Sequence, residues 1–255
     1  MKAVGFQQPG PIERQDALQD ITLEKPVAHG RDLLVEIKAV SVNPVDTKVR
    51  VNRQPQPDSW EILGYDAVGV VNAIGPAVEY FKVGDEVFYA GVINRPGTNS
   101  EFHLVDERIV GRKPTNLSDS AAAALPLTAI TAWEMLFDRL EVLRPTVEGG
   151  KLILVIGGAG GVGSITLQLL RAMTDLRIIA TASRPETKQW VMDSGAHHVL
   201  DHSQPLAPQM EALGLGKPGF VFSTTQTDRH YSDIVELIAP QGRFGLIDDP
   251  PTLDA

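Results

Sequence analysis

A glycine-rich segment in the second half of the chain places the strongest constraint on its fold. The residues Gly158-Ala159-Gly160-Gly161-Val162-Gly163 match the pattern G-x-G-x-x-G. They directly follow an apolar run, 151–157, that is typical of a buried strand, and the residues after them have the spacing of a helix. A strand, a glycine turn and a helix in this order predict the phosphate-binding turn of a dinucleotide-binding domain.

Three of these glycines have distinct expected roles. We expect Gly158 to allow the tight turn, Gly160 to let the backbone approach a pyrophosphate, and Gly163 to let the helix pack closely on the strand. The N-terminus of the helix then offers free N–H groups to the phosphates. The alternative is a structural turn that only packs a helix against a strand.

Strand and helix patterns alternate through the second half of the chain. We predict strands at 151–157, 177–182, 197–200, 219–223 and 242–247, and helices at 120–125, 128–140, 161–173, 185–194, 205–213 and 228–239. Ser118 is the predicted N-cap of the first of these helices. Such alternation predicts a parallel sheet with helices on both faces.

The first half of the chain has a different pattern. Short β-branched runs at 33–42, 67–74 and 81–89 are separated by Gly, Pro, Asn and Asp, which predicts strands. Within the last run, Gly84-Asp85 indicates a tight reversal. We therefore predict a compact β barrel or sandwich. Because 255 residues exceed what one core usually organises, we expect two domains, 1–120 and 121–255.

Composition excludes several classes of function. The net charge of −9, without a basic stripe, argues against a nucleic-acid partner. No apolar run of about 18 residues and no leader pattern is present, so we expect no membrane association and a cytoplasmic location. The chain has no cysteine, which excludes disulfides, thiolate nucleophiles and every cysteine-containing zinc site.

The end of the second predicted strand indicates which dinucleotide binds. About 20 residues after the last glycine the chain reads Thr181-Ala182-Ser183-Arg184, with no carboxylate to bind the ribose hydroxyls of NAD. Ser183, Arg184 and Lys188 instead offer donors and positive charge to a 2′-phosphate, so we expect NADP(H). The alternative is that Arg184 is an ordinary solvated residue at a helix start.

The order of the two halves and three further motifs resemble the medium-chain dehydrogenase/reductase superfamily. The motifs are Ala124-Leu125-Pro126-Leu127-Thr128-Ala129-Ile130-Thr131-Ala132-Trp133, Asn43-Pro44-Val45-Asp46-Thr47-Lys48-Val49-Arg50 and Gly64-Tyr65-Asp66-Ala67-Val68-Gly69-Val70-Val71. The last two are similar to the zinc-free quinone oxidoreductase branch, which lies close to proteins named zinc-type alcohol dehydrogenase-like. The resemblance covers the whole chain. It implies an N-terminal GroES-like β-barrel domain and a C-terminal Rossmann-type domain with a doubly wound parallel sheet.

The residues at the family's zinc positions do not suit zinc. Zinc members carry an early catalytic Cys and a Gly-His-Glu motif, whereas here the early segment holds Asn43 and the His-Glu positions hold Tyr65-Asp66. We therefore expect no metal. One further cluster contains potential zinc ligands, but we do not expect it to bind zinc: His197, His198, Asp201 and His202. The resemblance places it at the third strand of the nucleotide domain, where His202 is expected near the adenine end of the cofactor.

The resemblance implies an enzyme that transfers hydride from NADPH to quinones or α,β-unsaturated carbonyls. Hydride addition to such acceptors gives an enolate or hydroquinone anion, which hydrogen-bond donors stabilise without a metal. Asn43 and Tyr65 are the implied substrate-facing donors, Tyr65 also as a proton donor, and Thr128 is implied beside the nicotinamide. Asp46 and Arg50 are expected to order the Asn43 segment. The alternatives are that Asn43-Pro44 is a turn, that Tyr65 fills a barrel corner, that Thr128 is an ordinary helix residue, and that water supplies the proton.

The remaining expectations concern the cofactor contacts and the end of the chain. The predicted contacts are Gly158, Ala159, Gly160, Gly161, Val162, Gly163, Ser183, Arg184, Lys188, His202, Ser223, Leu246 and Ile247, together with Thr128. Similar chains continue through a sixth strand and a returning segment, so we expect a C-terminal truncation, weak cofactor binding and slow turnover. A homodimer is implied for the complete chain. Two alternatives remain: a zinc alcohol dehydrogenase, or a weakly catalytic NADP(H)-binding structural or sensor protein.

Overall fold

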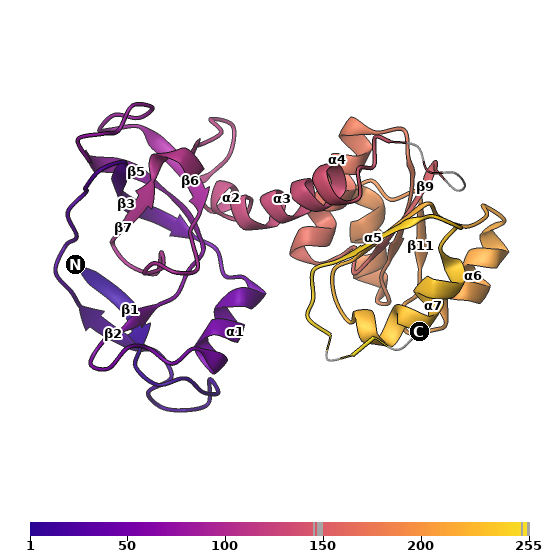
Figure 1. Ribbon diagram of the computed structural model, residues 1–255, viewed down its shortest axis with the longest axis horizontal. Helices are drawn as coiled ribbons and strands as arrows, with labels where there is room; N and C mark the ends of the chain where they lie inside the picture. The colour runs from indigo at the N-terminus through magenta and orange to yellow at the C-terminus, as the bar shows by residue number, and fades with distance from the viewer. Residues whose placement is uncertain (145, 147–149, 251, 254–255) are drawn as a thin grey trace. The chain divides into compact units, whose positions relative to one another are not determined.

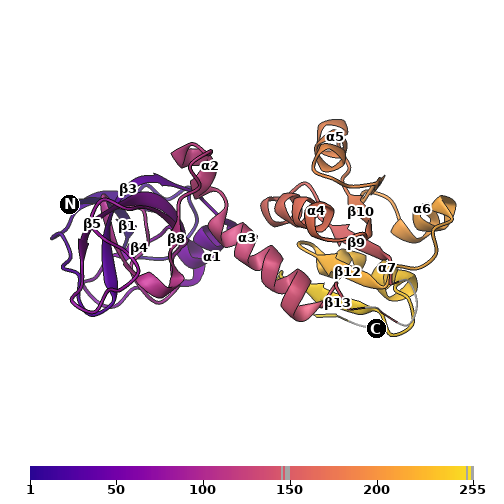
Figure 2. The ribbon, with the colours of Figure 1, turned by 90° about the horizontal axis from the view of Figure 1, so that it is seen from above.

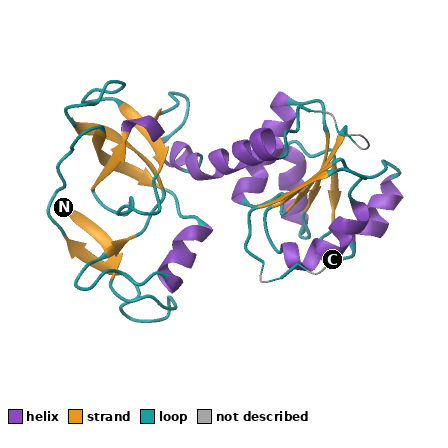
Figure 3. Cartoon of the chain, viewed as in Figure 1, coloured by secondary structure: helices purple, strands orange, loops and turns teal. Residues whose placement is uncertain are grey.

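The computed structural model describes residues 1–144, 146, 150–250 and 252–253 (Figure 1). The chain forms two compact units, Met1–Leu127 and Thr128–Ala255. The first consists mainly of strands and loops, and the second of strands alternating with helices (Figure 3). The predicted change of pattern between the two halves is therefore confirmed.

The first unit contains two antiparallel sheets. The larger has the order β7-β3-β5-β6-β8, with bounds Phe102–Asp106, Asp32–Val40, Asp66–Ile74, Glu86–Ala90 and Gly111–Arg112. The smaller has the order β2-β1-β4, with bounds Gln19–Thr22, Lys2–Phe6 and Glu61–Ile62. Inward-facing residues of the larger sheet form a core that includes Leu33, Val35, Val71, Val87 and Val105. The segment after Asn43 packs in a separate small core, in which Val49 lies with Phe6, Leu63 and Tyr65.

One local prediction for this unit was wrong, and one helix was not predicted. Within the predicted strand 81–89 only β6 is a strand, because Lys82 N donates to the Asp85 carboxylate (3.1 Å) and closes a turn there. Gly84 does adopt the left-handed conformation expected for a reversal, with φ +93°. The helix that was not predicted is α1, Pro44–Asn52, which begins at a residue pair that also suits a simple turn. Its start is stabilised by Asp46, whose carboxylate accepts from Asn43 N (2.7 Å).

The second unit contains one parallel sheet. Its order is β11-β10-β9-β12-β13, with bounds His198–Leu200, Arg177–Thr181, Leu152–Ile156, Phe220–Ser223 and Arg243–Leu246. The connecting helices are α4 (Gly161–Met173), α5 (Pro185–Asp193), α6 (Leu206–Leu213) and α7 (Thr227–Leu237). Side chains of α4 and α5 pack in one core and those of α6 and α7 in another, so both faces of the sheet are covered (Figure 2). The predicted elements differ from these only at their ends.

A helical run crosses the predicted boundary between domains 1–120 and 121–255. It comprises α2 (Asp119–Ala123), α3 (Pro126–Trp133) and a π-helical segment, Glu134–Arg139. The N-cap prediction is confirmed, because Ser118 Oγ accepts from Ala121 N (3.2 Å). By length and composition alone, the run Asp119–Arg139 is apolar enough to cross a membrane. Of this run 28% is buried, with Ala122 and Ala123 beside Val68 and Leu136 beside Leu140, and one such helix is weak evidence for a membrane span.

Candidate functional site

The glycine segment lies where the order of the parallel sheet reverses. Strand β9 lies between β10 and β12, and the segment follows β9 at its carboxyl end. Because all the strands are parallel, their carboxyl ends share one edge of the sheet. This edge is where ligands bind in open α/β sheets.

The local geometry of the glycine segment suits a phosphate-binding turn. The left-handed residue is Gly157 (φ +78°), one position before the Gly158 that sequence predicts for the tight turn. A Cβ at Gly158 would lie 2.9 Å from Ala180 Cβ, and one at Gly163 would lie 2.3 Å from Gly157 O. These two glycines therefore allow close packing. A Cβ at Gly160 would have a single near neighbour, Gly157 O at 3.4 Å, so the backbone face of Gly160 is open to a ligand.

Helix α4 begins without a side-chain cap. Its N-cap is Gly160, which has no side chain to accept a hydrogen bond from the first amides of the helix. Such amides, at the positive end of a helix dipole, suit a phosphate group. The preceding turn is held from β10, where the hydroxyl and the carbonyl of Thr181 accept from Gly157 N (3.0 Å) and Gly158 N (3.2 Å). Thr128 also lies at this turn, since a Cβ on Gly161 would be 3.2 Å from its Cγ2.

The cations predicted for a 2′-phosphate follow β10 and are both paired within the chain. Arg184 Nε lies 3.2 Å from Glu186 Oε1, and both side chains are largely exposed, 70% and 67%. An exposed pair of this kind is weak, so the guanidinium can turn to another anion. Lys188 Nζ lies 2.7 Å from Asp201 Oδ2 and holds the pKa of that carboxyl well below its usual range.

Four further predicted residues lie at the carboxyl ends of the remaining strands. His202 follows β11, and its Nδ1 lies 3.2 Å from Thr181 Oγ1. Ser223 ends β12, Leu246 ends β13, and Ile247 N donates to Ser223 O (3.2 Å). The parallel sheet therefore gathers the predicted cofactor residues at one edge.

A buried polar network that was not predicted from sequence lies beside this edge. Ser223 Oγ lies 2.8 Å from Thr227 Oγ1, and Asp248 accepts from both the hydroxyl and the amide of Thr227, the latter at 2.8 Å. Asp248 thus caps α7 from the segment after β13. The one available signal was an Asp directly after a predicted strand, which does not reveal the helix that it caps.

The predicted substrate-facing residues of the first unit form a hydrogen-bonded group. Asp46 accepts from Asn43 N (2.7 Å) with one oxygen and from Gly64 N (2.8 Å) with the other. Asp66 accepts from Asn43 Nδ2 (2.7 Å) and from Leu127 N (2.7 Å). Asn43, Asp46 and Asp66 are all buried, so the group is rigidly held. Asp46 orders the Asn43 segment as expected, whereas Arg50 hydrogen-bonds to Gly10 O instead.

Tyr65 has a buried hydroxyl that the described residues do not satisfy. The residue is 3% exposed, and its Oη makes no hydrogen bond of ordinary geometry in the described part of the chain, although the Arg53 guanidinium is near enough to act against the rise in its pKa. Burial raises the pKa of Tyr65, so its hydroxyl stays protonated at neutral pH. A buried unsatisfied hydroxyl is unfavourable unless a ligand completes it.

The side chains at the family's zinc positions do not fit a zinc ion. A catalytic zinc takes about three nitrogen, sulfur or carboxylate ligands, and here Asn43 Nδ2 and both Asp66 oxygens are already hydrogen-bonded to neighbours. Residues 1–144, 146, 150–250 and 252–253 contain no group of three or more His, Cys, Asp or Glu side chains suited to a metal. In the histidine cluster, His197 Nδ1 lies 2.9 Å from Ile178 N and Nε2 lies 2.7 Å from Arg171 Nη1.

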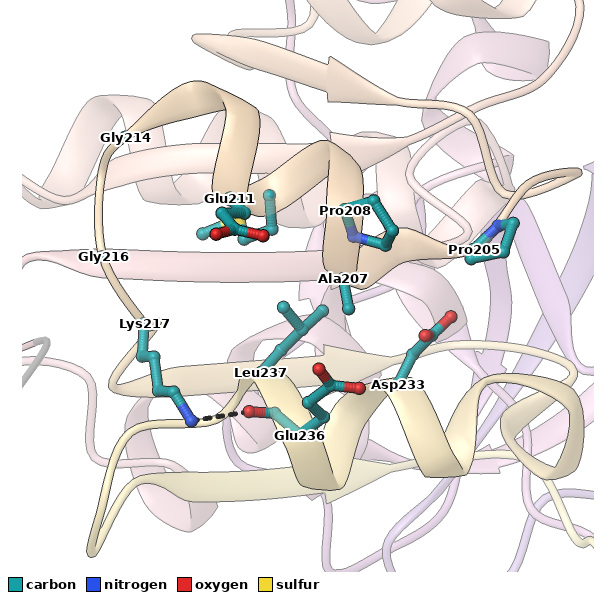
Figure 4. A pocket seen from close by; sticks show the side chains of 11 residues that line it. Pro205, Ala207, Pro208, Glu211, Gly214, Gly216, Lys217, Asp233, Glu236 and Leu237 are labelled. Carbon is teal, nitrogen blue, oxygen red and sulfur yellow. Dashed lines mark hydrogen bonds between the residues drawn. The ribbon is translucent and has the colours of Figure 1, made fainter.

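A separate groove of about 770 Å³ lies between α6 and α7 (Figure 4). Two acidic residues of α7, Asp233 and Glu236, line it, and Lys217 Nζ donates to Glu236 O at 2.7 Å. Asp233 also accepts from Leu206 N (2.9 Å) and so caps α6. These contacts are structural, and the groove contains none of the predicted site residues.

Comparison with known proteins identifies the family. Residues 29–115 match the family model described as the alcohol dehydrogenase GroES-like domain, and residues 161–248 match the one described as zinc-binding dehydrogenase. A GroES-like β domain joined to a parallel-sheet domain with a glycine turn defines a two-domain oxidoreductase. The chain belongs to the medium-chain dehydrogenase/reductase superfamily, in its quinone oxidoreductase branch.

Three similar proteins illustrate the relationship. A zinc-type alcohol dehydrogenase-like protein of Staphylococcus aureus is 42% identical over 248 residues, which are 97% of this chain and 73% of that protein. A Rhizobium etli structure provisionally described as a zinc-dependent alcohol dehydrogenase is 63% identical with a TM-score of 0.97, covering 100% of this chain and 74% of that one. Escherichia coli quinone oxidoreductase in complex with NADPH is 25% identical with a TM-score of 0.82, covering 96% and 72%. The zinc in two of these names conflicts with the side chains found at the zinc positions here.

Proposed function

We propose that this protein reduces quinones or α,β-unsaturated carbonyl compounds with NADPH and without a metal ion. The observation that supports the proposal most is the carboxyl edge of the parallel sheet. There the open backbone at Gly160, the uncapped start of α4 and the Ser183-Arg184 pair all belong to one edge. When bound, NADPH supplies the hydride, and the protein supplies orientation and hydrogen bonds.

The preference for NADP(H) rests on the residues after β10. They are Ala182, Ser183 and Arg184, so no carboxylate stands where it would bind the ribose hydroxyls of NAD and repel a 2′-phosphate. The exposed Arg184–Glu186 pair can exchange for an Arg184–phosphate pair, which is a stronger and often bidentate contact. The NADPH complex of the Escherichia coli relative supports the same choice.

In the first unit, Tyr65 and Asn43 are the proposed donors to the substrate oxygen. The Tyr65 hydroxyl is buried and makes no hydrogen bond of ordinary geometry in the described chain, and burial raises a pKa that already lies above neutral pH. Hydrogen bonds in such a low-dielectric setting stabilise developing negative charge better than water does. They suffice for the delocalised anion of an enone or quinone but less well for the alkoxide of an isolated ketone.

The test is NADPH consumption by the purified protein against quinones, enones and isolated ketones, with NADH in parallel and zinc measured by elemental analysis. We expect turnover with quinones or enones, little with ketones, a preference for NADPH, and zinc well below one ion per chain. Alcohol or ketone turnover with stoichiometric zinc would instead establish a zinc alcohol dehydrogenase. Tight NADPH binding without oxidation across the panel would indicate a structural or sensor protein.

A further inference from the structure

We propose that Asp66 is a positioning residue for this reduction, because its carboxylate sets the direction in which Asn43 presents its N–H groups and holds the first turn of α3. This inference rests on the proposed function. In this proposal Asp66 orients the Asn43 side-chain amide so that it can donate to the substrate oxygen. Asp66 itself does not contact substrate in this proposal.

The geometry on which the proposal stands is a carboxylate shared by two elements. One oxygen accepts from Asn43 Nδ2 at 2.7 Å and the other from Leu127 N at 2.7 Å. Asp66 is 0% exposed, so water does not compete for either oxygen. The same carboxylate therefore fixes the N-cap residue of α1 and an amide at the start of α3.

An ionised carboxylate accepts hydrogen bonds and donates none, so the Nδ2 side of the Asn43 amide must face Asp66. Asn43 Nδ2 carries two hydrogens, and one of them is directed to Asp66. The direction of the second hydrogen is then determined, and this is the donor that we assign to the substrate oxygen. If the amide turned over, two oxygens would face one another in a buried setting, which is strongly unfavourable.

The charge state of Asp66 decides whether both bonds can exist. Burial raises the pKa of Asp66 to about 6, and the charged group that acts on it is Asp46 of α1, which raises it further. Its other polar contacts are neutral: Asn43, Leu127 N and the Thr98 hydroxyl, which donates to Asp66 O (3.1 Å). No ion pair to Asp66 is found in the described part of the chain. Protonation removes the charge of Asp66 and places a hydrogen on one of its oxygens, which weakens the bond that this oxygen accepts, so the arrangement weakens as pH falls through about 6.

The test compares Asp66→Asn with wild type in the intact protein, using NADPH and the best acceptor of the panel from about pH 5 to about pH 8. Asparagine has nearly the same shape but only one acceptor oxygen, so its NH₂ group must face one of the two donors. We expect kcat to fall roughly tenfold or more, with the KM for NADPH within about twofold of wild type. For wild type we expect a loss of rate below about pH 6, and we expect this loss to be absent in Asp66→Asn.

Glu107→Gln is the matched control. Glu107 is also a buried carboxylate of this unit, but it binds Arg31 and the amides of Glu79 and Tyr80, away from Asn43. This variant should keep the wild-type kcat and pH profile. An equal loss of kcat in Glu107→Gln and Asp66→Asn, or a wild-type profile in Asp66→Asn, would overturn the proposal.

A second measurement does not need turnover. The Asn43 side-chain NH₂ resonances, identified by their loss in Asn43→Ser, should shift with a midpoint near pH 6 in wild type and stay unshifted in Asp66→Asn. A wild-type signal that does not titrate in this range would refute the proposal. If none of the acceptors in the panel supports NADPH oxidation by wild type, the proposed function fails. The resonance measurement then still decides whether Asp66 orients Asn43.

Discussion

The hydroxyl of Thr181 accepts a hydrogen bond from the amide of Gly157 at 3.0 Å, and its carbonyl accepts from the next amide, Gly158 N, at 3.2 Å. One residue at the end of β10 therefore holds the entry to the glycine turn that follows β9. Thr181 is fully buried, so these bonds are shielded from water.

We expect Thr181→Val to weaken NADPH binding about three- to tenfold, because the variant leaves the Gly157 amide without its acceptor while preserving shape. The readout is the Kd from NADPH fluorescence. Thr166→Val is the matched control, since Thr166 is also buried and its hydroxyl has no partner in the described chain. That variant should bind NADPH normally, and an equal effect in both variants would argue against a specific role for Thr181.

Replacing Arg184 with alanine should raise the Kd for NADPH roughly ten- to hundredfold and leave the Kd for NADH within about twofold. The reason is that a guanidinium contact to the 2′-phosphate is lost and NADH has no such phosphate. Glu186→Gln removes the competing carboxylate, 3.2 Å from Arg184, and should tighten NADPH binding. A parallel loss for both cofactors in Arg184→Ala would count against the assignment of this residue.

Tyr65→Phe should lower kcat about tenfold or more while leaving the melting temperature unchanged or higher, because the removed hydroxyl is buried without a partner in the described chain. Tyr89→Phe gives the opposite expectation. Tyr89 Oη lies 3.0 Å from His103 Nδ1 in the core, so this variant should lose stability and keep its kcat. The pair of variants separates a hydroxyl held for the substrate from one that stabilises the fold.

Acid should destabilise the first unit through His103. Burial lowers the pKa of His103 to about 4, whereas an unfolded histidine titrates near pH 6.5. Between these values the unfolded chain binds more protons than the folded one, so stability is present above about pH 6.5 and is lost as pH falls towards 4, by up to roughly 3 kcal/mol. His103→Gln can keep the bonds to Tyr89 Oη and Pro96 O but does not titrate. Urea unfolding should therefore show a smaller fall in stability for this variant between about pH 6.5 and about pH 5.

Much of the second unit could be predicted from sequence because strand and helix periods alternate there without interruption. The glycine turn after β9 indicated the candidate binding edge, and in the parallel topology Arg184, His202 and Ser223 follow or end strands at that same edge. What sequence did not indicate are contacts across long separations. Asp66 to Leu127 and Thr227 to Asp248 join residues whose neighbours in the chain give no sign of the partner.

The first unit was harder to predict, for a related reason. Short strands such as β4 and β8 are defined by their partners in the sheet and have too few residues for a periodic signal. Helix α1 was missed although Pro44 at its first position and Asp46 in its first turn are both helix-start signals. The resemblance of residues 43–50 to a family segment does not by itself indicate a helix, whereas these two local capping signals do.

The carboxylate that caps α7 belongs to Asp248, which follows β13. Local unfolding of α7 and local unfolding of β13, the last described strand, are therefore coupled. Fraying β13 removes the acceptor from the Thr227 amide and hydroxyl and so loosens the first turn of α7. Native-state hydrogen exchange should accordingly group the amides of α7 and β13 in one cooperative opening event, distinct from that of α4 and α5 on the opposite face of the sheet.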